Sequence, residues 1–190
     1  MKKRGIFKLG LFFIFFTPSV CHGQYKTGGI KKIAVKVNTT SLTNLYKVTD
    51  SIYRSEQPNK KAFRELSLLG IKSVLNLRNS HADPKNLKDT AMQFFSVSMQ
   101  AKHCTDTAII TALKILINAP KPILVHCRYG ADRTGLVIAM YRIIIENWSK
   151  EQALDELQNG GFHFHKSYTN IPEFINTVGL ENIRAMVLSK

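Results

Sequence analysis

The feature that most constrains the fold is a strand, a tight turn and a helix over residues 122–146. The run PILVH at 122–126 is continuously apolar, which is typical of a strand buried on both faces of a parallel sheet. Apolar residues at helical spacing predict a helix over 134–146. The turn between them, from Cys127 to Arg133, lies at the carboxyl end of the strand. Ligands bind at that edge in open α/β sheets.

The rest of the chain alternates between strand and helix patterns. Short apolar or alternating runs predict strands at 45–48, 52–54, 74–77 and 94–99, and helical spacing predicts helices at 59–69, 84–91, 105–117 and 172–178. Ser149 and Gln152 form a capping box that starts a further helix, and the tail from Leu180 is also expected to be helical. This alternation predicts one α/β domain with a mainly parallel sheet and helices on both faces. No internal repeat or linker interrupts it.

The first 23 residues have the pattern of a secretory signal peptide. Three basic residues at positions 2–4 precede the apolar run 9–16, and small residues follow near Cys21. The apolar run is much shorter than the roughly 20 residues of a transmembrane helix. An uncleaved anchor is the alternative, whereas lipid modification of Cys21 is disfavoured because a poor lipobox precedes it. We therefore expect an exported protein, periplasmic or secreted, or membrane-anchored if the leader is retained.

The mature chain is expected to be a basic arm at 24–44 followed by a catalytic domain at 45–190. The formal charge is +14, from 27 basic and 13 acidic residues, and it falls to about +10 without the leader. Such an excess favours anionic partners. No nucleic-acid-binding motif is present, so nucleic acid is not expected as a partner. The Lys-rich stretch 31–36 is interpreted as a solvated face, with peripheral contact to anionic lipid as the alternative. The sequence does not indicate an oligomeric state.

The turn after the buried strand has the chemistry of an anion site. Five residues between Cys127 and Arg133 allow successive backbone N–H groups to converge on one centre, a geometry called a nest. The following helix adds its positive end there, and such surroundings stabilise a thiolate at Cys127. The Arg133 guanidinium can bind two phosphate oxygens, and Thr134 places a hydroxyl near the sulfur.

Chance is a weak explanation for this turn. Cys-x5-Arg alone arises at random in about one such chain in eight, and requiring His126 and Gly130 as well reduces that to a few in ten thousand. The structural alternative is that Cys127 is a small buried hydrophobic residue and Arg133 a surface charge.

The segment from His126 to Gly135 resembles the signature His-Cys-x2-Gly-x2-Arg-Ser/Thr of the cysteine-based protein tyrosine phosphatases, in their dual-specificity-like branch. The resemblance extends from Leu45 to about Gly161. The strings LYKVTDSIYRSEQP, GIKSVLNLR and KPILVHCRYGADRTGLVIAMYR look like those of exported bacterial phosphatases of this type, whose substrates are unassigned.

This resemblance implies a phosphatase that needs neither metal nor cofactor and forms a phosphocysteine intermediate. It implies Cys127 as nucleophile, Arg133 as phosphate ligand and Thr134 as thiolate partner, with His126 in a structural role. The phosphate would be bound by the backbone amides of Arg128, Tyr129, Gly130, Ala131, Asp132 and Arg133.

The expected partner is a phosphorylated substrate: a phosphotyrosine peptide, a phosphoinositide or a soluble inositol phosphate. Lipid-directed relatives often carry Lys where this chain has Ala131, which disfavours the lipid. The alternative from another class is an inactive phosphate-binding module.

The sequence does not decide which residue is the general acid. The family usually supplies an Asp from a mobile loop, but the chain has no Trp-Pro-Asp triplet. Asp106 is the only carboxylate between Asp89 and Asp132, although it could simply cap a helix. Asp132 resembles the loop Asp of myotubularin-like lipid phosphatases, and its alternative role is to orient the loop.

Several other polar residues have two interpretations. Cys104 is expected to be a free thiol, with a reversible disulfide to Cys127 as the alternative. His163 and His165 are expected to be packed or at the surface, because too few neighbours could complete a metal site. Three residues at predicted strand ends either line the pocket or pair with neighbours: Arg54, Gln57 and Arg78. Phe94 and Phe95 are assigned to the core.

Overall fold

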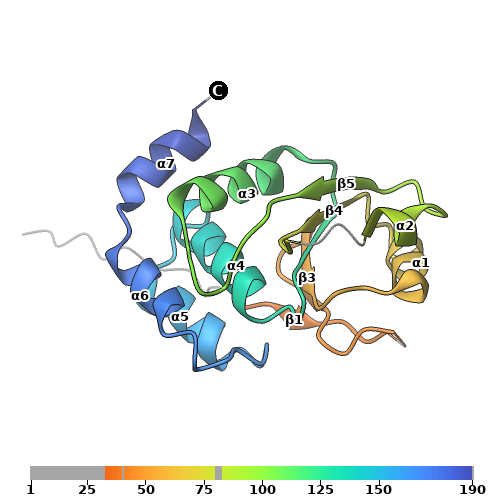
Figure 1. Cartoon of the computed structure of the whole chain (residues 1–190), viewed down its shortest axis with the longest axis horizontal. Helices are drawn as coiled ribbons and strands as arrows, with labels where there is room; N and C mark the ends of the chain where they lie inside the picture. Colours follow the sequence, from red (N-terminus) through yellow and green to blue (C-terminus); the bar gives the residue numbers. More distant parts are fainter. Residues whose placement is uncertain (1–32, 40, 80–82, 190) are drawn as a thin grey trace, which may run out of the picture. The chain divides into compact units, whose positions relative to one another are not determined.

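The computed structural model describes residues 33–39, 41–79 and 83–189 (Figure 1). The predicted signal peptide at 1–23 and the first part of the predicted arm lie outside these residues. Within the described ranges, no helix has the length and apolar character needed to cross a membrane.

A six-stranded sheet forms the centre of the fold, with the strand order β1-β2-β3-β6-β4-β5. The strands are β1 (Val35–Lys36), β2 (Tyr46–Lys47), β3 (Ile52–Ser55), β4 (Ser73–Asn76), β5 (Gln93–Ser96) and β6 (Ile123–His126). The pairs β1–β2 and β2–β3 are antiparallel, and the other three pairs are parallel. The prediction of a mainly parallel sheet is confirmed. In register, His126 pairs with Ser55 on one side and Asn76 on the other, so three strands end together at the site.

Within the described part of the chain, seven helices pack around this sheet. They are α1 (Lys60–Leu68), α2 (Asp83–Leu87), α3 (Asp106–Asn118), α4 (Asp132–Ile144), α5 (Lys150–Asn159), α6 (Asn170–Thr177) and α7 (Leu180–Leu188). The capping box of α5 is formed as predicted, between Ser149 and Gln152. Helix α2 is shorter than the predicted 84–91. It ends because the backbone N–H and hydroxyl of Thr90 both donate to the Leu87 carbonyl.

Neighbouring residues of the central strands face opposite sides of the sheet, as the pleat requires. Val74 and Leu124 join the apolar cluster that includes Phe63 of α1. Leu75 and Val125 join the larger cluster that α3 to α7 build on the other face. Figure 1 shows α1 and α2 on one side of the sheet and the other helices across from them. Helices on both faces, as predicted, explain why β4 and β6 are completely buried.

The ordered fold begins before Leu45, where the sequence placed its start. Val35 and Lys36 form β1 and pair with β2, and the Ala34 amide donates to the buried Glu156 carboxylate at 2.9 Å. Leu42 is 4% exposed and belongs to the α1 cluster. The predicted boundary was too late. The strand has only two residues, both exposed, so it has no apolar periodicity to detect.

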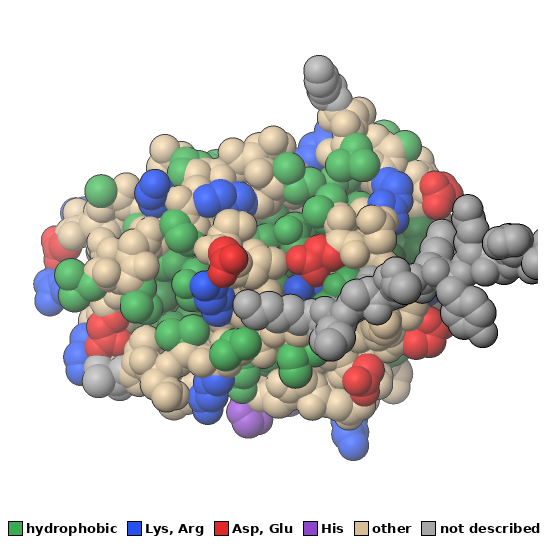
Figure 2. Space-filling view, turned by 180° about the vertical axis from the view of Figure 1, so that it is seen from behind, with side chains coloured by type: hydrophobic (Ala, Val, Ile, Leu, Met, Phe, Trp, Pro, Cys, Tyr) green, Lys and Arg blue, Asp and Glu red, His purple; other side chains and the backbone are tan. Residues whose placement is uncertain are grey.

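Charges of both signs are interspersed on the face shown in Figure 2. Ion pairs among the described residues include Lys47 with Asp50, and both Lys60 and Arg64 with Asp89. On this face the positive net charge is therefore not gathered into one continuous basic patch.

Candidate active site

The Cys127–Arg133 loop joins the end of β6 to the first turn of α4, so the predicted strand–turn–helix arrangement is confirmed. Cys127 is 1% exposed at the base of the loop, whereas Arg128 and Tyr129 are exposed. Helix α4 begins at Asp132, two residues before its apolar pattern. The last part of the loop is therefore already helical.

Three successive carbonyl groups of the loop are each bound from outside it. The Arg128 carbonyl accepts from the Gln57 backbone N–H at 3.2 Å. The Tyr129 carbonyl accepts from Asn44 Nδ2 at 2.8 Å, and the Gly130 carbonyl accepts from Arg54 Nη2 at 2.8 Å.

These contacts fix the direction of the loop amides. In a planar trans peptide the N–H points away from the C=O. The N–H groups of Tyr129, Gly130 and Ala131 therefore face the concave side of the loop. The loop is a preformed nest for an anion.

Gly130 makes this close packing possible. Its φ is +70°, a conformation that residues with a side chain rarely adopt. A Cβ placed on it would lie 2.4 Å from the Ser55 carbonyl carbon and 2.5 Å from the Glu56 nitrogen. The loop can lie against the end of β3 only with glycine here.

Unpartnered donors surround the same centre. Ala131 starts α4 without a side-chain cap, which leaves first-turn amides available to an anion. Arg133 Nε and Thr134 Oγ1 are buried without a hydrogen-bond partner among the described residues. Arg133 Nη1 donates to the Met99 carbonyl at 3.3 Å. Buried donors without partners are uncommon in folded proteins, and a bound phosphate would satisfy them.

The two candidate acids have different surroundings. Asp132 is 4% exposed, and both oxygens of its carboxylate contact His165. The His165 backbone N–H donates to Oδ1 at 3.0 Å, and the ring Nδ1 lies 2.9 Å from Oδ2. Asp106 is the exposed first residue of α3, and its side chain makes no hydrogen bond or ion pair among the described residues. Thr105, not Asp106, caps the helix by accepting from the Ala108 N–H.

Sequence reasoning missed or left open three residues that contact the loop. Asn44 fell in the predicted arm, where a single polar residue carries no signal of burial. The role of Arg54 was left open, and the structure assigns it to the Gly130 carbonyl. His165 was expected only to be packed or at the surface, and it contacts Asp132. Gln57 pairs with Arg78 Nη1 through its side chain at 2.7 Å.

The remaining candidates lie around this centre. His126 is buried beneath the loop, with Nδ1 3.3 Å from the Cys127 carbonyl. Cys104 and Cys127 are both free thiols. Asn170 Nδ2 lies 3.5 Å from Cys104 Sγ and also donates to the Ala101 carbonyl. No group of three metal-binding side chains occurs among the residues that the structure describes.

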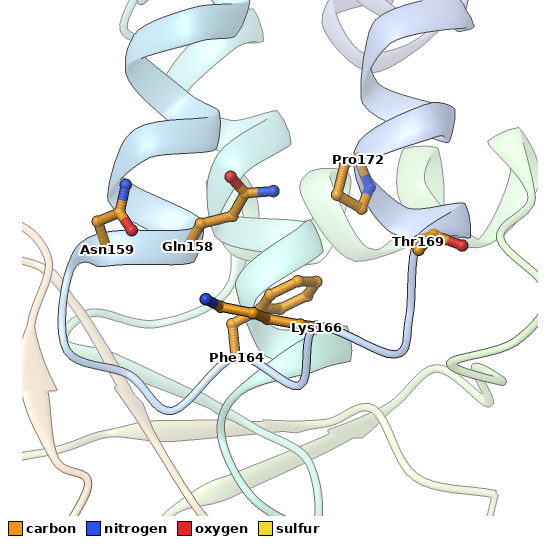
Figure 3. Close-up of a pocket in the computed structure, with 6 residues that line it drawn as sticks. All are labelled: Gln158, Asn159, Phe164, Lys166, Thr169 and Pro172. Atoms are coloured by element: carbon orange, nitrogen blue, oxygen red, sulfur yellow. The ribbon is translucent and has the colours of Figure 1, made fainter.

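A separate pocket of about 400 Å³ lies between the end of α5 and the start of α6 (Figure 3). It is lined by Gln158, Asn159, Phe164, Lys166, Thr169 and Pro172. Its lining contains none of the predicted site residues. Phe164 and Lys166 flank His165 in sequence, so this pocket shares a segment with the contact to Asp132.

Comparison with known proteins identifies relatives along most of the chain. A sequence model of the tyrosine phosphatase family matches residues 40–185. The dual specificity protein phosphatase TpbA of Pseudomonas aeruginosa is 31% identical over 143 residues, which cover 74% of this chain and 65% of TpbA. The inositol diphosphatase DSP5 of Arabidopsis thaliana is 32% identical over 124 residues, 60% of each protein. The matched region thus spans less than two thirds of the length of these relatives.

Solved structures resemble this fold closely. The crystal structure of P. aeruginosa TpbA superposes with a TM-score of 0.75 at 29% identity, over 83% of this chain and 97% of that one. A TpbA variant in complex with pTyr superposes with a TM-score of 0.74 at 28% identity, over 86% of this chain and 100% of the TpbA chain. The core catalytic domain of the Saccharomyces cerevisiae PP-IP phosphatase SIW14 superposes with a TM-score of 0.69 at 29% identity, over 78% of this chain and 93% of that domain.

Proposed function

Because this chain belongs to the tyrosine phosphatase family, we propose that it hydrolyses phosphate monoesters through a phosphocysteine formed on Cys127. The observation that supports this best is the set of outward hydrogen bonds on the Arg128, Tyr129 and Gly130 carbonyls. They direct three amides to the concave side of a loop that has a buried cysteine at its base. Such an arrangement binds a phosphoryl group and stabilises a thiolate at the same place.

In the first step, the Cys127 thiolate attacks phosphorus, an S–P bond forms and the P–O ester bond breaks. The leaving oxygen takes a proton from a general acid. The loop amides and the Arg133 guanidinium bind the three equatorial oxygens, where charge is concentrated in the transition state. In the second step, water gives a proton to the ionised general acid and attacks phosphorus, and the S–P bond breaks. Inorganic phosphate and the thiolate result. The Thr134 hydroxyl donates to the departing sulfur.

We propose Asp106 as the general acid. Its carboxylate is exposed and unengaged among the described residues, so it can carry a proton and deliver it. The loop that precedes it contacts the site, because the Met99 carbonyl accepts from Arg133. Asp132 suits this role less well, since its carboxylate is 4% exposed and both of its oxygens already contact His165.

Phosphotyrosine peptides are the first substrate class that we propose. The support is the exposed Tyr129 ring at the loop and the TpbA relative whose structure was solved in complex with pTyr. Inositol phosphates are the second class, because four relatives are named inositol diphosphatases. An inactive phosphate-binding module would show binding without turnover.

Export to the periplasm or beyond, by a signal peptide at 1–23, is also a proposal. It is supported by the basic and apolar pattern of those residues. Peripheral contact with anionic lipid through the Lys-rich stretch at 31–36 is a weaker proposal, supported only by its charge.

The test is phosphate release by the chain without residues 1–23, under reducing conditions, with Cys127→Ser as the matched control. The substrates are a small aryl phosphate, a phosphotyrosine peptide, a phosphoinositide and a soluble inositol phosphate. We expect turnover that the variant lacks and a preference for the phosphotyrosine peptide. Binding of inorganic phosphate without turnover of any substrate would show that the protein is an inactive phosphate-binding module and not an enzyme.

A further inference from the structure

Two arginines are completely buried in this fold, and their surroundings differ. Arg54 and Arg142 are each 1% exposed. Arg142 donates to both oxygens of Glu156, at 2.8 and 2.7 Å, and to Glu146 at 2.7 Å. Among the described residues, Arg54 makes no ion pair with any carboxylate. Its only hydrogen bond there is to the Gly130 carbonyl, and its Nε has no partner.

A buried cation without a carboxylate is costly, because the desolvation of its charge is not recovered. Burial lowers the pKa of Arg54 to about 10, so the side chain still carries its charge at neutral pH. The guanidinium lies 3.8 Å from the centre of the Phe162 ring, which recovers part of the cost through a cation–π contact. A neutral donor could make the hydrogen bond to Gly130, as Asn44 does for Tyr129. The hydrogen bond alone therefore does not explain the charge.

The charged and titratable groups that act on Arg54 are Glu156, Cys127, Tyr46 and Arg142. Glu156 is the strongest favourable charge on Arg54, but both of its oxygens are bound by Arg142 and it makes no ion pair with Arg54. The Tyr46 hydroxyl donates to the Gly161 carbonyl at 3.1 Å. After Glu156, the next favourable charge on Arg54 is that of Cys127, at the base of the loop whose Gly130 carbonyl Arg54 binds. The other ionisable groups on the loop and beneath it are His126, Arg128, Tyr129, Asp132 and Arg133.

We propose that Arg54 is a positioning residue with an electrostatic function. It fixes the Gly130 carbonyl away from the nest, and its buried charge favours both the Cys127 thiolate and a bound phosphate dianion. The part that concerns phosphate rests on the proposed function, whereas the part that concerns the thiolate does not require turnover.

The experiment separates the charge of Arg54 from its hydrogen bond. The variants are Arg54→Gln, which keeps an amide donor, and Arg54→Lys, which keeps the charge. Arg142→Gln is the matched control, since it removes an equally buried arginine that is paired with carboxylates. All lack residues 1–23, and with them Cys21, and all carry Cys104→Ser, so that iodoacetamide reports on Cys127 alone. The readouts are the pH midpoint of Cys127 alkylation, protection by inorganic phosphate, and Tm.

For Arg54→Gln, we expect the alkylation midpoint to rise by about one pH unit and protection by phosphate to need roughly tenfold more of the anion. Arg54→Lys should shift the midpoint by well under one unit. Arg142→Gln should lower Tm and leave the midpoint unchanged. If Arg54→Gln does not fold, the unbranched and uncharged Arg54→Met takes its place.

An unchanged midpoint in a folded Arg54→Gln or Arg54→Met variant would overturn the inference. So would an upward shift in Arg54→Lys as large as in the uncharged variants. Phosphate release by the parent protein keeps the two proposals separate. A shifted midpoint in a protein without turnover supports the inference and contradicts the proposed enzymatic function. Turnover with an unchanged midpoint contradicts only the inference.

Discussion

His165 contacts both carboxylate oxygens of Asp132, with its backbone N–H 3.0 Å from Oδ1 and its ring Nδ1 2.9 Å from Oδ2. This contact joins the segment after α5 to the first turn of α4, 33 positions away in sequence. The His165 ring also lies 5.2 Å from the Tyr129 ring, centre to centre. The segment after α5 thus supports the Cys127–Arg133 loop near the exposed edge of the site.

We expect His165→Ala to lower kcat/KM about tenfold, because a hydrogen bond to a charged group contributes about 1.5–3 kcal/mol. The backbone contact to Asp132 remains in this variant, so the loop should still form. Steady-state kinetics with an aryl phosphate measure the effect. His163→Ala is the matched control, since His163 is exposed and makes no hydrogen bond among the described residues. Equal rates in the two variants would remove His165 from the site.

Asp106→Asn should slow the release of alkyl-like, poor leaving groups by about 10²–10³, because these need the proton that a general acid supplies. Nitrophenyl phosphate should be affected much less. Asp132→Asn should instead lower Tm and lower kcat/KM for all substrates by the same factor, because it weakens the contact with His165. The measurement is kcat/KM across aryl phosphates whose leaving groups differ in pKa. The assignment fails if Asp132→Asn, not Asp106→Asn, steepens this dependence.

Gly130→Ala should abolish turnover and cost about 3 kcal/mol of stability. The added Cβ would lie 2.4 Å from the Ser55 carbonyl carbon, on a residue whose φ is +70°. Thermal unfolding and phosphate release test this together. Gly179→Ala is the control, because nothing lies within 4 Å of its Cβ position. A Gly130→Ala protein that retains its activity would show that the loop does not need this backbone geometry.

The sequence predicted the elements whose residues carry strong patterns. The fully buried β6 is a nearly continuous apolar run and β4 has an apolar centre, and α3 and α5 have apolar spacing or a capping box that depends only on nearby residues. β1 could not be found this way, because its two residues are exposed and only their pairing with β2 makes them a strand. Leu42 is likewise buried only because α1 covers it.

The same difference applies to the site. Cys127, Gly130 and Arg133 belong to one short segment, so their spacing could be recognised. Asn44, Arg54 and His165 reach that segment from 33 to 85 positions away, and no local pattern connects them to it. Contacts between distant segments depend on the fold itself, which explains why the nucleophile was predictable and its supporting residues were not.

Cys104 should react slowly with iodoacetamide near neutral pH. Burial raises the pKa of its thiol, although the contact with Asn170 opposes this. The raised pKa also makes the stability of the fold depend on pH. The folded protein binds this proton more tightly than the unfolded chain, so the contribution is present below the ordinary thiol pKa and is lost as pH rises through the folded value.

Mass spectrometry of the alkylated protein can follow Cys104 and Cys127 separately. We expect Cys127 to be modified first, and Asn170→Ala to slow the reaction of Cys104 further, because the contact that lowers its pKa is lost. If Cys104 were the faster thiol, it would not be shielded as the structure shows. It would then be the group that an oxidant reaches first, which is what a protective disulfide with Cys127 requires.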